Sequence, residues 1–176
     1  MHAFTLVFLA ALALATAARL WLSSRHIRHI AAKRDAVPAE FAGRIPLAAH
    51  QKAAAYNIAK SRIGAVETIA AAALTLALTL GGGLQWISAA WERAFQAGGY
   101  AHGVALIVSV VVLSAVFDLP FGLYRTFVVE ARFGFNRMTL RLFVLDMLKA
   151  ALIGALVGIP LVLVVLWLMQ AAGGYW

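Results

Sequence analysis

The five histidines of this chain are its clearest candidate metal ligands, and none of them is spaced as in a hydrolytic zinc site. Such a site takes two histidines at i and i+4, a glutamate general base between them and a third ligand, which together hold the metal and activate its water. His26 and His29 are spaced at i and i+3, which could put two imidazoles on one helical face. No third ligand accompanies them, so we interpret them as part of a basic collar beside a membrane. The sequence predicts no catalytic residue and no metal site in this chain.

Other common catalytic signatures are missing as well. The chain has no cysteine, which excludes disulfides, thiol catalysis and cysteine–zinc sites. It has no Gly-x-Ser-x-Gly elbow, no phosphate-binding loop and no dinucleotide-binding glycine pattern. We therefore expect that this chain alone is inactive.

A polar and aromatic block, residues 118–149, is the best candidate for a working surface, because it lies between two long apolar segments that carry no charge. Pro120 is expected to end one helix, and residues 123–132 can form another. Gly134 is expected just past that helix, in the left-handed conformation that glycine tolerates. Asn136 is then expected to cap the next helix by accepting a hydrogen bond from its free N–H groups.

This block and a second, upstream one carry a family resemblance. The first consists of Leu119-Pro120-Phe121, Leu123-Tyr124, Thr126-Phe127-Val128, Glu130, Gly134-Phe135-Asn136, Thr139, Phe143, Asp146 and Lys149, and the second of Val37-Pro38, Ala53, Tyr56, Lys60-Ser61-Arg62 and Gly64. Together they resemble the N-terminal membrane domain of the type I CAAX prenyl proteases, which are zinc metalloproteases of the membrane. The resemblance runs from near Leu20 to the C-terminus and covers less than half of such an enzyme.

The resemblance implies a function and its partners. Helices of such a domain wall a chamber within the membrane, and the cytoplasmic loops help to place a peptide or membrane-protein substrate. A C-terminal catalytic metalloprotease half would carry the zinc of this metalloendopeptidase. The candidate chamber residues are Tyr124, Phe127, Glu130, Phe135 and Asn136, and the candidate structural residues are Pro120, Gly134, Tyr56, Lys60 and Arg62. For Phe127 and Phe135 the alternative is that they only pack the loops together, since aromatic side chains mostly serve burial.

Composition predicts an integral membrane protein. Of its 176 residues, 64% are hydrophobic, well above the roughly 45–50% of soluble domains. Because the net charge of +8 lies beside apolar segments, it indicates topology and lipid contact rather than nucleic acid. We expect one all-α domain, residues 1–176, with four transmembrane helices. The predicted spans are residues 4–22, 63–80, 103–117 and 150–169.

Basic residues also predict the orientation. They are concentrated in residues 23–62 and 118–149, so we expect these two helical loops in the cytoplasm and both termini outside. In a bacterium this would be the inner membrane. The first span resembles an uncleaved anchor rather than a signal peptide, because its arginines follow the apolar run instead of preceding it.

Within the second span, Glu67 is an ionisable group that lies one turn inside the apolar region. It is either a functional group or one that reaches headgroup water, Lys60 or Arg62. Gly81-Gly82-Gly83 is expected to end the second span. Gly154 and Gly158 form a small-residue face suited to close helix packing, and Pro160 would kink the last span.

A different class of function stays open. A free-standing four-span scaffold or assembly factor would show the same composition. A small transporter is less favoured, because no ionisable residue lies at mid-span. The reading frame after Trp176 would separate the first two hypotheses, since a protease would continue to a His-Glu-x-x-His motif.

Overall fold

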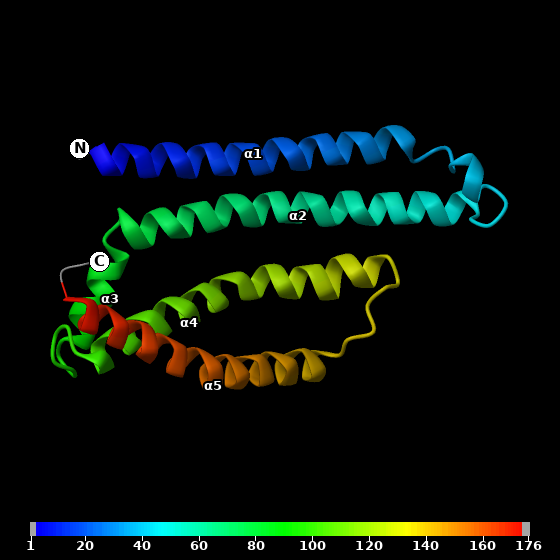
Figure 1. Ribbon diagram of the computed structural model, residues 1–176. Helices are drawn as coiled ribbons and strands as arrows, with labels where there is room; N and C mark the ends of the chain where they lie inside the picture. The colour runs from blue at the N-terminus through cyan, green and yellow to red at the C-terminus, as the bar shows by residue number, and fades with distance from the viewer. Residues whose placement is uncertain (1–2, 174–176) are drawn as a thin grey trace. The chain divides into compact units, whose positions relative to one another are not determined.

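The computed structural model describes residues 3–173, which contain helices and no strand (Figure 1). The helices are α1 (Ala3–Lys33), α2 (Leu47–Thr79), α3 (Gly83–Trp91), α4 (Tyr100–Tyr124) and α5 (Leu140–Ala172), with two short segments, η1 (Ala39–Phe41) and η2 (Arg125–Glu130). The predicted all-α class is confirmed.

Four of these helices are long and apolar enough to cross a membrane: α1, α2, α4 together with η2, and α5. Each has 31 or 33 residues, or roughly 46–50 Å at 1.5 Å per residue, whereas the hydrocarbon core is about 30 Å thick. The four predicted spans are therefore the apolar parts of longer helices. α3, with nine residues, is too short to cross and was not predicted.

The expected helix end at Pro120 is wrong. Pro120 lies inside α4, which continues into the π-helical turn η2 and reaches Arg132 without a break. A proline lacks the N–H of one helical hydrogen bond and crowds the preceding turn, but a membrane helix accommodates it through local adjustments of its winding. α5 likewise continues through Pro160. Residues 118–149 thus form two helix ends joined by a short connection.

That connection contains one confirmed and one wrong prediction. Gly134 has a φ of 69°, the expected left-handed conformation just past a helix end. Asn136 does not cap α5, because Thr139 occupies the cap position and its hydroxyl accepts from the Leu142 N–H at 3.3 Å. The backbone N–H of Asn136 instead donates to the Glu130 carbonyl at 3.2 Å. Residues 135–139 are not helical, and α5 begins three residues later than predicted.

We expect Thr139→Ala to lower the free energy of unfolding by about 1 kcal/mol, because alanine leaves the first N–H groups of α5 without this acceptor. Thr139→Ser keeps an acceptor and should cost only a small part of that. Reversible denaturation of the chain in detergent micelles measures both. An equal loss in the serine variant would show that the threonine methyl group, and not the cap, stabilises this helix start.

The residues divide into two compact units, which are Met1–Leu76 with Asp118–Asn136, and Ala77–Phe117 with Arg137–Trp176. In the first unit, α1 and α2 run antiparallel side by side (Figure 1). Ser23 Oγ donates to the Ser61 carbonyl at 3.3 Å, and the imidazole Nε2 of His50 lies 3.1 Å from the Lys33 carbonyl. Side chains therefore join α1 to α2 in the parts of the two helices that the basic residues predict to be cytoplasmic.

In the second unit, α3 packs against α4. The indole N–H of Trp91 donates to Ser109 Oγ at 2.8 Å. α3 starts directly after α2 because Gly82 adopts a φ of 79°, so the predicted helix end at the three glycines is confirmed. Gly154 and Gly158 border open space, where an added Cβ atom would meet no neighbouring atom within 4 Å. This small-residue face therefore packs against none of the described residues.

Candidate functional site

An aromatic cluster of Tyr56, Phe133 and Phe135 joins α2 to the connection after η2. The Tyr56 ring meets Phe133 edge-on with ring centres 5.6 Å apart, and meets Phe135 in the same way at 5.0 Å. Lys52 Nζ lies 5.2 Å from the centre of the Phe135 ring. The two sequence blocks that carry the family resemblance therefore meet here. Phe133 was not among the predicted residues, although it lies two positions before Phe135.

The turn at Gly134 makes this arrangement possible. The N–H groups of Phe135 and Asn136 both donate to the Glu130 carbonyl, at 2.9 and 3.2 Å. This tight turn lets the rings on either side of Gly134 contact the same tyrosine. These contacts support the alternative hypothesis that Phe135 packs the loops together. The Glu130 carboxylate forms no hydrogen bond or ion pair with another described residue.

A second surface, the apolar hollow, combines other predicted residues. It has a volume of about 440 Å³ and is lined by Arg62, Ile63, Val66, Pro120, Phe121 and Tyr124. Tyr124 is 52% exposed, so a ligand in the hollow can reach it. Phe127, one turn further on, is half-buried and has contacts of its own. Lys60 is exposed on α2 and does not line the hollow.

A polar cavity lies next to this hollow in the same unit. It is about 470 Å³ in volume and is lined by Arg19, Gly64, Glu67, Thr68, Ala71, Asp118, Phe121, Gly122 and Arg125. Arg125 Nη2 donates to both carboxylate oxygens of Glu67. The sequence suggested Lys60 or Arg62 as partners of Glu67, which is wrong. Nothing in the sequence links Glu67 to a residue 58 positions away.

The histidines that the structure describes in the first unit are not grouped with a third metal ligand. His29 of α1 and His50 of α2 line one small hollow of about 230 Å³ together with Lys33 and Asn57. Across the residues that the structure describes, no group of three or more His, Cys, Asp or Glu side chains is placed to hold a metal ion. Because zinc takes at least three protein ligands, the side chains present do not fit it.

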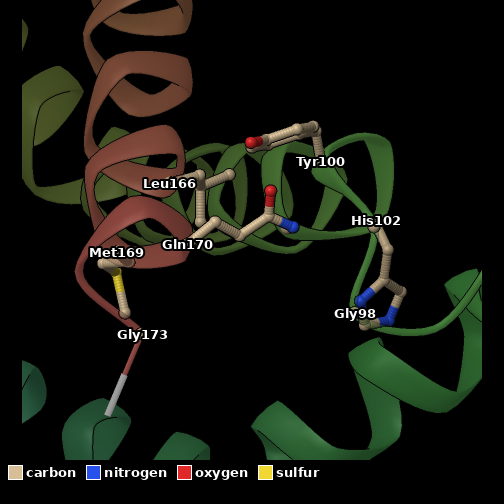
Figure 2. A pocket seen from close by; sticks show the side chains of 9 residues that line it. Gly98, Tyr100, His102, Leu166, Met169, Gln170 and Gly173 are labelled. Carbon is tan, nitrogen blue, oxygen red and sulfur yellow. The ribbon is translucent and has the colours of Figure 1, made fainter. Parts of the chain in front are cut away.

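The second unit has a pocket of about 420 Å³ between α4 and α5, lined by Tyr100, His102, Leu166, Met169, Gln170 and four glycines (Figure 2). Imidazole Nε2 of His102, a buried residue, lies 3.2 Å from both the carbonyl and the hydroxyl of Ser88. A carbonyl only accepts, so Nε2 carries the proton and cannot take one from the Ser88 hydroxyl. This serine–histidine pair is therefore not a nucleophile and its base; it fastens α3 to α4.

Four long apolar helices, with polar residues placed where the apolar runs end, define this chain as an all-helical integral membrane domain. The family described as "CAAX prenyl protease N-terminal, five membrane helices" matches residues 26–176. The chain belongs to this family. Of the five helices in that description, the described residues contain four that are long enough to span.

Relatives with this domain are longer proteins. The chain is 32% identical over 154 residues to "CAAX prenyl protease 1 homolog" of Oryza sativa subsp. japonica. The matched region covers 84% of this chain and 36% of that protein. It is 29% identical over 154 residues to the Arabidopsis thaliana protein of the same name, covering 82% and 36%. A shorter match to "CAAX prenyl protease 1" of Saccharomyces cerevisiae is 41% identical over 49 residues. The chain spans about a third of the length of the first two relatives.

Proposed function

We propose that this domain walls an intramembrane chamber of a CAAX-prenyl-protease-like zinc metalloendopeptidase and helps to place the substrate. The observation that carries this proposal is the meeting of the two family-like sequence blocks. One unit joins them through the aromatic cluster, and the same unit presents Tyr124 in the apolar hollow. A surface built from two separate blocks in this way has a defined shape, which positioning a substrate requires.

The chemistry of the apolar hollow supports a peptide with an apolar side chain or a membrane-embedded segment as its occupant. Phe121, Ile63 and Val66 supply apolar area, and Arg62 also lines the hollow. Tyr124 combines a large ring with a hydroxyl, which suits a contact with both an apolar group and a peptide bond. We assign Glu130 and Asn136 to the support of the turn that holds the aromatic cluster, through the backbone hydrogen bonds between them.

Zinc belongs, in this proposal, to the other part of the longer protein. This chain has no His-Glu-x-x-His motif, and its described side chains do not supply three ligands. A zinc ion there would activate a water for peptide hydrolysis. The residues of this chain would bind and orient the peptide, and keep the helices that surround it in place.

The proposal is tested in two steps. The reading frame that contains this chain should continue beyond Trp176 to a His-Glu-x-x-His motif; a stop codon directly after Trp176 in an expressed gene would contradict the proposal and favour the scaffold hypothesis. In the full-length protein, Tyr124→Ala should then reduce turnover of a peptide substrate about tenfold or more, because a misplaced substrate loses near-attack geometry. The melting temperature should stay nearly unchanged, since Tyr124 is 52% exposed.

Trp86→Ala is the matched control, because Trp86 is an exposed aromatic residue of the other unit and should not affect turnover. A Tyr124→Ala protein with unaltered turnover would remove the apolar hollow from the proposed substrate path.

A further inference from the structure

The polar cavity contains an unpaired cation and an unpaired anion. Of its four charged side chains, Glu67 and Arg125 neutralise each other. Arg19 of α1 and Asp118 of α4 line the same cavity, and neither forms an ion pair or hydrogen bond with another residue that the structure describes. In addition, the Nε atom of Arg125 is buried and has no hydrogen-bond acceptor within residues 3–173.

The cavity lies at the level where the apolar runs end. Arg19 is the first formally charged residue after an uncharged N-terminal run, and Asp118 is the first after the uncharged residues 103–117. Glu67 lies about one turn inside the apolar part of α2, which begins near Ile63. In a membrane this level borders the lipid headgroups, where a polar ligand with an apolar tail can enter from the side.

Charged groups next to hydrocarbon are costly unless they are paired. A ligand that satisfies this cavity therefore needs anionic oxygens for Arg19 and a cationic N–H donor for Asp118. We propose that the polar cavity binds the phosphoethanolamine headgroup of an aminophospholipid. The phosphate lies toward the Arg19 guanidinium and the primary ammonium toward Asp118, while the acyl chains stay in the bilayer.

Other common headgroups match the cavity less well. A glycerol headgroup carries the phosphate but no cation, so Asp118 would face an added negative charge. A choline headgroup carries a cation without any N–H, so it cannot form the charge-assisted hydrogen bonds that make an ammonium–carboxylate contact strong. The geometry of charges thus predicts selectivity for the ethanolamine lipid over both others.

The test is native mass spectrometry of the full chain, purified in detergent and mixed with equal amounts of phosphatidylethanolamine, phosphatidylcholine and phosphatidylglycerol. The ethanolamine lipid should be retained most. Asp118→Asn should weaken its binding about tenfold, the equivalent of one charge-assisted hydrogen bond, and should abolish the preference over phosphatidylcholine. Arg19→Gln should weaken the binding of all three, because each carries the phosphate.

Asp146→Asn and Arg141→Gln are the matched controls, since both residues are exposed on α5 and do not line the cavity. Asp118→Glu keeps the carboxylate and should keep the preference, which separates loss of the charge from loss of the fold. On the unaltered chain, water-soluble phosphoethanolamine at high concentration should displace the ethanolamine lipid.

Three results would overturn the proposal. Equal retention of the ethanolamine and choline lipids by the unaltered chain would show that the ammonium is not recognised. A preference that survives in Asp118→Asn would place the site elsewhere. Binding of free phosphoethanolamine without retention of the intact lipid would show a site for a soluble molecule. None of these measurements involves peptide cleavage, so the proposal stands apart from the proposed protease function.

Discussion

Tyr56→Ala should lower the free energy of unfolding by about 3 kcal/mol, which is the largest effect that we expect from a single side chain in this protein. The substitution removes a half-buried aromatic ring and both of its edge-on contacts, to Phe133 and Phe135. Truncating an aromatic core residue typically costs about 3–5 kcal/mol, and a ring pair adds roughly 0.5–1.5 kcal/mol. Because Tyr56 is only half-buried, we place its cost at the lower end.

Tyr56→Phe is the matched control. No hydrogen bond of the Tyr56 hydroxyl is found in the described residues, so the phenylalanine variant keeps both ring contacts and should lose less than about 1 kcal/mol. Reversible denaturation with a denaturing detergent measures the two variants against the unaltered chain. If the phenylalanine variant were as unstable as the alanine variant, the hydroxyl and not the ring would hold the connection to α2.

Glu67→Ala should destabilise the protein by about 2 kcal/mol, because it leaves the Arg125 guanidinium without its bidentate partner. Breaking a fully buried ion pair costs about 3–5 kcal/mol. The side chains here are 37% exposed for Arg125 and 26% for Glu67, so screening reduces the loss below that range. Arg125→Ala should also destabilise the protein, because it leaves the Glu67 carboxylate without the donor that reaches both of its oxygens.

A double-mutant cycle separates the pair from other contacts. If Glu67 and Arg125 act mainly on each other, the double alanine variant should be more stable than the sum of the two single losses predicts, by about 1 kcal/mol or more. Additive losses would show that each side chain stabilises the fold through other neighbours. Asp118→Asn serves as a control, since Asp118 lines the same cavity without joining this pair.

The ion pair also connects two helical elements of the fold, α2 and η2. Glu67 is in the apolar half of α2, and Arg125 opens the π-helical turn after α4. The ion pair attaches the start of η2 to α2, and the aromatic cluster attaches the connection after η2 to the same helix, so the two contacts lie on either side of residues 126–132. A segment attached at both ends cannot move freely, so residues 126–132 are held beside α2.

Much of the architecture follows from the sequence for a simple reason. A membrane span must satisfy its backbone hydrogen bonds internally, so an uncharged apolar run of sufficient length has only one workable structure. The four spans follow from this requirement. The helix end at Gly81–Gly83 and the left-handed Gly134 follow from another local property, the conformational freedom of glycine. The family resemblance also rests on local patterns, which is why it could be found before the fold.

Side-chain capping and helix ends were harder to predict. Pro120 and Asn136 have strong local preferences for a helix end and a helix start, and the structure uses neither residue in that way. The membrane removes water as a competing partner, so a helix that has begun tends to continue past residues that would end it in a soluble protein. Thr139 satisfies the same capping rule that pointed to Asn136, three residues further along the chain.

What the sequence by itself determined about this protein is its class: four apolar helices, the loops that carry its charge, and membership of a family of membrane-protease domains. Only the tertiary structure decided which side chains meet. Glu67 with Arg125, and Tyr56 with Phe133 and Phe135, are pairs separated by more than fifty residues. Their contacts depend on how two helices are aligned along each other, and a shift of a single turn would give each residue a different partner. Periodicity and composition describe each helix separately, so they carry no information about that alignment.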